Sequence, residues 1–597
     1  MDIGEQIFEL REQRQVSLDE LALGVCSPES LRNIELGKET VSKPFMELLF
    51  QRLGKSTDKL ELILSEEVYE EELLLERYEE LLEQGDGEAA YRVLEVFREK
   101  APLDSNVHRM LYCRNRAYAE FRLTKNPEQA KEWMRKALDI TMPGWQEKRL
   151  EEYWISTIEM ENLLAYAKAL SAMGTQPELE TAESLLLACK RFIDGRITDE
   201  EEHAKINAKC AYLLAELYKK QGNVKETELC AEKAFQELRE YGISYFMEPL
   251  LEILAQCNSE NGMEKPLYQK YLTALKHIKE FAGMEAFFTD SLFKNCSQQT
   301  DYLDYELFWE ERIVQGYSQE RMIEGVYKNP ESLSRAERGK VTMRDSKLIR
   351  LFHRLGIDKS RYNGFVVTDK YEDLELKQKV DILITRECYD DAELAVDELK
   401  KRLDLNIAEN RRWIQGYEIA IERKKENTAK ELLLEKAQKL LQETYRLQTH
   451  GVYRSPMDRE VSLINQIGIL LKELGRKEET LQLVNSVTAA MRNSKIDLKK
   501  RSRKYSLLRT NLAKWEESAC VAKENIQFTL SCGKLCTLPV DYMTVASAQI
   551  DIPTNKEICR DMIKDIYFLC DLVQNNTNKE KSKRYYEKKF GDELKII

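Results

Sequence analysis

The chain has 597 residues, which is long enough for several domains. Its hydrophobic content of 43% supports buried cores, and its net charge of −13 excludes a uniformly basic nucleic-acid coat while leaving room for a local basic face. The sequence lacks an apolar stretch near the ~18 residues that a membrane span requires, its charged start does not resemble a secretory signal, and its 13 scattered cysteines indicate free thiols. We therefore expect a cytoplasmic protein that does not enter a membrane.

A motif that occurs twice organises the chain. PESLRNIELGK begins at Pro28 and PESLSRAERGK at Pro330, 302 residues later, and the same spacing relates Tyr69 to Tyr371. Long segments with apolar residues at helical spacing follow each motif. The sequence thus predicts an all-α fold with two small helix-turn-helix bundles, each followed by a TPR-like α-solenoid. The predicted domains are head 1 (1–64), solenoid 1 (65–300), head 2 (301–362) and solenoid 2 (363–597).

Four helices are predicted in head 1. The first runs from Gly4 to Gln13, and Ser17 caps the second with Glu20 completing a capping box. The third opens at Ser27-Pro28 and ends before Gly37, and a fourth covers 45–53.

The solenoids are predicted from paired helices of tetratricopeptide (TPR) size. Gly222 and Gly475 are each followed by residues at identical steps, which are the steps at which TPR-like repeats place small side chains: Val224, Thr227, Ala231 and Ala234 after the first, and Lys477, Thr480, Val484 and Val487 after the second. A long helix is expected over 145–173, and the polar, basic stretch near the end is expected to cap the second stack.

Both heads resemble the Cro/repressor-type (XRE family) helix-turn-helix. Head 1 matches that pattern at Arg11, Ser17, Leu21, Ala22, Glu35, Gly37 and Lys38. Head 2 matches it at Arg312, Gly316, Ser318, Gln319, Glu337, Arg338, Gly339 and Lys340, although Arg321 and Met322 replace the usual Leu-Ala. The resemblance implies structural ion pairs between Arg11 and Glu35 and between Arg312 and Glu337.

Local charge favours head 2 as the DNA reader, because affinity for a duplex comes mainly from phosphate neutralisation. From Cys26 to Arg52 four basic residues are balanced by four glutamates, whereas from Lys328 to Arg354 eight basic residues stand against three acidic ones, a net charge of +5. In head 2 we expect double-stranded DNA to be contacted by Gln319, Lys328, Ser332, Ser334, Arg335, Arg338, Lys340 and Arg344. The head 1 candidates are Ser30, Arg32, Asn33 and Lys38.

A head of this type joined to a TPR-like solenoid resembles the RRNPP (Rgg/PlcR/PrgX) group of peptide-sensing transcription regulators, which act in quorum sensing. The resemblance implies a short peptide ligand on the inner solenoid helices, where asparagine amides can pair with a peptide backbone. The candidates are Asn162, Asn207, Asn465 and Asn511. Two units on one chain are consistent with either a homodimer or an intramolecular pseudo-dimer.

One other function stays open. A helical adaptor with vestigial heads fits the low total basicity. An enzyme has no support, because the five histidines lack metal-ligand spacing and no phosphate-binding glycine loop occurs, so neither metal nor cofactor is expected.

Overall fold

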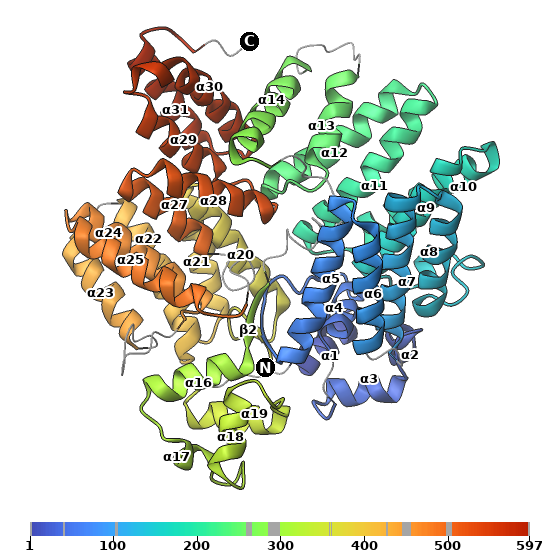
Figure 1. The fold of residues 1–597 in the computed structure, drawn as a ribbon, viewed down its shortest axis with the longest axis horizontal. Coiled ribbons are helices and arrows are strands. Elements are labelled where there is room, and N and C mark those ends of the chain that lie inside the picture. Colours follow the sequence, from blue (N-terminus) through green and yellow to red (C-terminus); the bar gives the residue numbers. More distant parts are fainter. Residues whose placement is uncertain are drawn as a thin grey trace.

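The computed structural model describes residues 3–39, 42–101, 105–257, 265–284, 299–357, 359, 361–425, 428–443, 455–496 and 504–594. The fold is all-α, as predicted, with two small bundles of short helices and two stacks of paired helices (Figure 1). Within these ranges, no helix combines the length and the apolar character needed to cross a lipid bilayer.

The described residues of head 1 form four helices and a short strand. Its elements are α1 (Ile3–Gln13), α2 (Leu18–Ala22), α3 (Pro28–Glu35), α4 (Lys43–Arg52) and β1 (Leu60–Leu64). The predicted capping box is present, since the Ser17 side chain accepts a hydrogen bond from the Glu20 backbone and the Glu20 carboxylate accepts one from the Ser17 backbone. Head 2 repeats this order after an additional strand: β2 (Thr300–Leu303), α16 (Asp304–Val314), α17 (Gln319–Ile323), α18 (Pro330–Glu337), α19 (Asp345–Arg354) and β3 (Tyr362–Gly364).

Solenoid 1 consists of stacked helix pairs: α5 (Glu66–Gln84), α6 (Gly87–Lys100), α7 (Asn106–Ala119) with the π turn η1 (Glu120–Thr124), α8 (Pro127–Thr141), η2 (Leu150–Glu152), α9 (Thr157–Met173), α10 (Gln176–Arg196), α11 (Glu200–Lys220), α12 (Val224–Tyr241), α13 (Met247–Gln256) and α14 (Lys265–Ala282). The helix predicted over 145–173 is too long at its start. The Ser156 side chain caps α9, and the Glu159 carboxylate accepts from the Ser156 backbone, so the chain before Thr157 turns instead.

Solenoid 2 has the same paired arrangement: α20 (Tyr371–Thr385), α21 (Tyr389–Arg402), α22 (Ala408–Lys425), α23 (Lys430–Gln442), α24 (Asp458–Glu473), α25 (Lys477–Arg492), α27 (Tyr505–Glu516), α28 (Ala519–Ser531), α29 (Leu538–Gln549), η3 (Pro553–Asn555), α30 (Lys556–Leu572) and α31 (Asn576–Phe590). Its last helix, α31, packs on α30 and leaves a basic, exposed face.

A three-stranded sheet that the sequence did not predict joins the two heads. The strand order is β2-β1-β3, with β1 parallel to β2 and antiparallel to β3. Glu61 of β1 pairs with Asn363 of β3, which lies 302 residues later and so occupies the corresponding position of the other half. The β1–β3 pair therefore has local two-fold symmetry, which β2 breaks. Apolar side chains of both heads pack with this sheet in one hydrophobic core.

The far ends of the two solenoids are also joined symmetrically. Ser244 donates its backbone N–H to the Gly533 carbonyl at 3.0 Å, and Leu535 donates to the Gly242 carbonyl at 2.8 Å. Gly242 has a positive φ of 61°, and an added Cβ would lie 2.4 Å from the Cys536 Sγ, so only glycine permits this close approach. Next to these turns, α14 packs against α28 and α30 (Figure 1).

Candidate functional sites

Each head is held together by the ion pair that its motif predicts. The Arg11 guanidinium donates to both Glu35 oxygens, at 2.6 and 3.1 Å, and to the Val16 carbonyl at 2.9 Å. The Arg312 guanidinium likewise donates to both oxygens of Glu337 and to the Tyr317 carbonyl. Because these pairs are buried and fully hydrogen-bonded, they belong to the core of each head and are not available to DNA.

The third helix of each head exposes one polar face. In α3, Leu31 and Ile34 are buried, and in α18, Leu333 and Ala336 are buried. Both helices are capped, because Ser27 accepts from the Ser30 backbone and Asn329 from the Ser332 backbone. The outward positions are the predicted Ser30, Arg32 and Asn33 on α3, and Ser332, Ser334 and Arg335 on α18.

Head 2 presents an open basic surface, which we define as Lys328, Arg335, Arg338, Lys340 and Arg344. All five side chains are exposed, and in the described part of the chain none forms an ion pair with a carboxylate. Two of the three acidic residues of this segment are already neutralised, since Glu337 pairs with Arg312 and Asp345 with Arg361. The accessible charge of head 2 is therefore more positive than its composition indicates.

Head 1 presents a weaker surface. Two of the cations that enter its charge count are buried: Lys43 pairs with Glu72 at 2.6 Å and Asp301 at 3.2 Å, and Arg52 pairs with Glu159 at 2.6 Å. Lys38 and Arg32 are exposed, but so are Glu29 and Glu39, and the Ser30 hydroxyl donates to Glu39 at 2.9 Å. This face is neutral and partly self-paired.

Gln319 was expected to meet DNA from the start of the second helix. Its amide instead donates to Glu337 Oε2 at 2.5 Å, and the residue is half-buried. The amide thus belongs to the ion pair inside head 2. A contact with DNA would require this hydrogen bond to break.

Both heads lie at the same end of the molecule, with α3 and α18 on its lower edge in the view of Figure 1. Arg52 is one of several buried residues that fix head 1 to solenoid 1; another is Lys59, which pairs with Asp199 at 2.5 Å. The Arg52 guanidinium donates to Leu21 and Leu23 carbonyls of its own head at 2.8 Å, and to the Thr141 carbonyl at 2.9 Å and the Glu159 carboxylate. A single buried side chain therefore ties the turn after α2 to α8 and α9.

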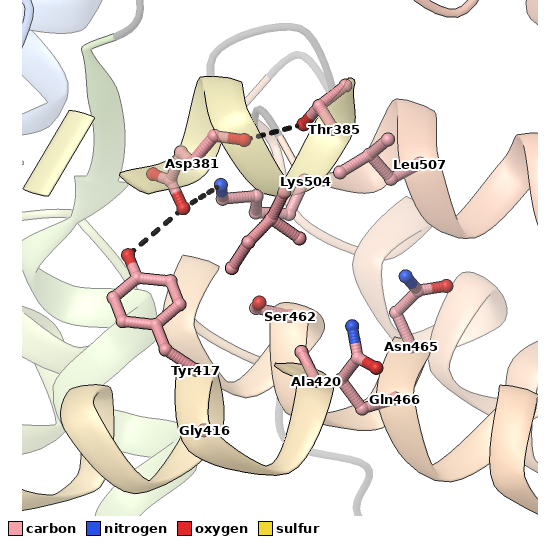
Figure 2. Close-up of a pocket in the computed structure, with 11 residues that line it drawn as sticks. Asp381, Thr385, Gly416, Tyr417, Ala420, Ser462, Asn465, Gln466, Lys504 and Leu507 are labelled. Atoms are coloured by element: carbon pink, nitrogen blue, oxygen red, sulfur yellow. Dashed lines mark hydrogen bonds and ion pairs between the residues drawn. The ribbon is translucent and has the colours of Figure 1, made fainter. Parts of the chain in front are cut away.

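A polar groove opens in solenoid 2 between α20, α22, α24 and α27 (Figure 2). Asn465 lines it, and Asn511 donates its amide to the Asn465 side-chain oxygen at 2.9 Å, so these two predicted ligand residues lie together. On the other side, Asp381 accepts from Tyr417 at 3.0 Å and pairs with Lys504 at 2.7 Å. Burial alone would raise the pKa of Asp381, but Lys377 and Lys504 lower it to about 2, so it is ionised.

The other two predicted ligand residues, Asn162 and Asn207, lie in the interior of solenoid 1. Asn162 is fully buried and its amide faces the Met110 sulfur at 3.3 Å. Asn207 is also buried, and its amide donates to Glu237 at 2.6 Å. Both lie within the packed helices of solenoid 1, away from the groove of solenoid 2.

The sequence reasoning missed the groove residues Arg412, Gly416, Ser462 and Gln466. One signal was available: a glycine within a helical pattern is unfavourable unless packing or function requires it, and Gly416 lies in the middle of α22.

Comparison with known proteins returns no matching family model and no matching curated protein. Among solved structures, the chain is similar to Bacillus thuringiensis PlcR, crystallised in complex with the peptide PapR7 and DNA. The two are 16% identical with a TM-score of 0.32, over 47% of this chain and 98% of PlcR. A TM-score this low supports no conclusion about fold or function.

Proposed function

We propose that this protein is a ligand-responsive, DNA-binding transcription regulator. Head 2 contacts the duplex with α18 in the major groove, and a short peptide binds in the groove of solenoid 2. The proposal includes the four-domain organisation predicted from the sequence, in which the two head-plus-solenoid units are tandem copies that form an intramolecular pseudo-dimer.

The basic surface of head 2 carries this proposal. Five exposed cations around the exposed face of α18 lack carboxylate partners among the described residues, although the whole chain is acidic. Unpaired cations gathered around a capped recognition helix are suited to a phosphate backbone on either side of the major groove. If this surface were only a solvent-exposed helix face, its cations would be expected to form ion pairs with acidic neighbours. The exposed face of α6 does so in Arg92–Glu88 and Arg98–Glu95.

Arg335 is the best candidate for base contact, because it lies on the exposed face of α18 itself. Lys328, Arg338, Lys340 and Arg344 flank that helix and are suited to phosphates. Head 1 contributes less, because the surface of its third helix is neutral and because Lys43 and Arg52, the two remaining cations of the segment from Cys26 to Arg52, are buried.

The groove of solenoid 2 supports the sensing part of the proposal. Its lining combines the amides of Asn465 and Gln466 with the aromatic side chains of Trp413 and Tyr417, and Asn511 donates to the Asn465 side-chain oxygen. Amides that can donate and accept are suited to the backbone of an extended peptide, and aromatic walls are suited to its side chains.

A salt titration of duplex binding tests the DNA-binding part. We expect affinity of the full chain for a random-sequence duplex to fall steeply as salt rises, because phosphate contacts release counterions. An absence of duplex binding, or binding that ignores ionic strength, would favour the alternative function, a helical adaptor whose heads bind protein partners.

A further inference from the structure

The two solenoids carry opposite kinds of side chain at corresponding positions. α7 begins at residue 106 and α22 at residue 408, a separation of 302, which is the spacing of the repeated motif. Arg114 on α7 therefore corresponds to Gly416 on α22. The two helices also share their burial pattern, with Leu111 and Trp413 both buried at another corresponding pair.

The same comparison holds for α9 and α24. The residue before each helix donates its backbone N–H to a glutamate in the first turn. Ser156 donates to Glu159 in α9, and Met457 donates to Glu460 in α24. In this register, Glu161 corresponds to Ser462 and Ala165 to Gln466. The large charged side chains of Arg114 and Glu161 in solenoid 1 thus correspond to a glycine and a serine in solenoid 2.

In solenoid 1 these charged side chains fill the space between the inner helices. Arg114 donates to Glu161 Oε2 at 3.2 Å, while Lys209 and Tyr245 donate to Oε1 at 3.2 and 2.8 Å. Arg114 also stacks over the Tyr118 ring at 4.9 Å. Glu161 and Lys209 are 1% and 0% exposed, so the cluster is sealed from solvent.

In solenoid 2 the corresponding space is open. A Cβ added to Gly416 would meet no heavy atom within 4 Å, and Gly416 and Ser462 border two adjoining cavities of about 40 and 30 Å³. Figure 2 shows Gln466 and Asn465 across this space from Asp381 and Lys504. These volumes hold only small chemical groups, so one group of a peptide would enter the cavities and the rest of the peptide would lie outside them along the groove.

Three polar atoms in this groove are buried without a hydrogen-bond partner in the described part of the chain. They are the donors Nη1 of Arg412 and Nε of Arg459 and the acceptor Oε1 of Gln466, and all three residues line the smaller cavity. Arg459 is already paired with Glu409, whereas Arg412 is not. Burial lowers the pKa of Arg412, which makes no ion pair with any described carboxylate. A group with both a carboxylate or carbonyl oxygen and an N–H, as a peptide has, would satisfy the Arg412 donor and the Gln466 acceptor.

We propose that each chain binds one ligand and not two. The site is the groove bordered by Gly416, Ser462, Gln466 and Arg412, and a peptide carboxylate or carbonyl meets Arg412. The corresponding space of solenoid 1 takes no ligand, because Arg114, Glu161 and Lys209 occupy it. The peptide nature of the ligand rests on the proposed function, whereas the difference between the two grooves does not.

Thiol labelling of the full chain tests this difference without a ligand. Ala165→Cys and Gln466→Cys place a thiol at corresponding positions, and mass spectrometry assigns the labelled site. We expect maleimide to modify the Gln466→Cys chain under native conditions at least about tenfold faster than the Ala165→Cys chain, since the buried position reacts only after local opening. Adding Gly416→Arg should protect the Gln466→Cys thiol, whereas Gly195→Arg, at an exposed glycine of α10, should not. Equal labelling of the two positions would overturn the proposal.

Native mass spectrometry then counts the ligands. The probe is a synthetic pool of random short peptides with free carboxyl termini, incubated with the full chain. We expect one peptide per chain, loss of binding in Gly416→Arg/Ser462→Glu, and binding at least about tenfold weaker in Arg412→Gln, because a charge-assisted hydrogen bond is lost. Two peptides per chain, or one that survives Gly416→Arg/Ser462→Glu, would refute the single site. A wild-type chain that retains no peptide would overturn the peptide ligand and the sensing part of the proposed function, while the labelling result would still decide whether the grooves differ.

Discussion

Removing three flanking cations of head 2 should change how DNA binding responds to salt. The variant is Arg338→Ala/Lys340→Ala/Arg344→Ala, and each side chain is exposed and without an ion-paired carboxylate within the described ranges. Each phosphate contact contributes about −0.9 to the slope of log affinity against log salt, so three lost contacts reduce the slope by about 2.7. Between about 50 and about 200 mM salt, wild-type affinity should therefore fall about 40-fold more than that of the variant.

Fluorescence anisotropy with a labelled random duplex measures this slope, and the control separates local from total charge. Arg92→Ala/Arg98→Ala/Lys100→Ala removes the same formal charge from α6, where all three side chains are exposed and paired with glutamates. We expect the control to keep the wild-type slope. If both triple variants lose the same slope, or neither does, the basic surface of head 2 is not the DNA-binding surface.

Three further predictions concern stability. Arg52→Ala should lower the free energy of unfolding by about 3–5 kcal/mol in urea titrations, because Glu159 is left charged and buried, and adding Glu159→Gln should recover part of this loss. Burial raises the pKa of Asp541 to about 8 against the hydrogen bonds from Asn525 and Thr510. The folded chain thus holds this proton more tightly than the unfolded chain, and the stabilisation is complete below about pH 4 and lost as pH rises through about 8. The melting temperature of the wild-type chain should therefore fall as pH rises to 9, and Asp541→Asn should reduce this fall, whereas the exposed control Asp551→Asn should not. A fall in Asp541→Asn as steep as in the wild-type chain would contradict the reasoning. Gly242→Ala should destabilise the junction of the solenoids by more than ~1–2 kcal/mol, which is the cost of a left-handed conformation for a non-glycine residue, because the added Cβ also meets Cys536. Hydrogen exchange measures this local loss of stability. Exchange rates that stay unchanged at residues 242–244 would refute the reasoning.

Local interactions explain what the sequence determined on its own. The capping box of Ser17 and Glu20 and the helix boundaries at Pro28 and Pro330 depend on residues within a few positions of one another. The Arg11–Glu35 and Arg312–Glu337 pairs were predictable because the motif resemblance supplied the fold that brings them together.

Tertiary packing decided the rest. A charge count treats Arg52 and Lys43 as surface cations, but distant residues, Glu159 and Asp301, bury and neutralise them. Helical periodicity identifies one apolar face, yet it does not reveal which polar residues neighbouring helices also cover. Asn162 and Asn465 are both buried, but only packing with other helices decided that Asn162 faces Met110 and that Asn465 borders a groove.

The same reason applies to the sheet and to the two grooves. β1 is held by partners about 240 and 300 residues away, and its apolar sequence LELIL does not distinguish a strand from a buried helix segment. Whether Arg114 fills a groove and Gly416 opens one depends on which side chains face them from other helices. The sequence by itself therefore determined the repeated helical units and their local caps, and only the tertiary structure decided which charges reach solvent and which groove is open, because both depend on contacts between residues far apart in the chain.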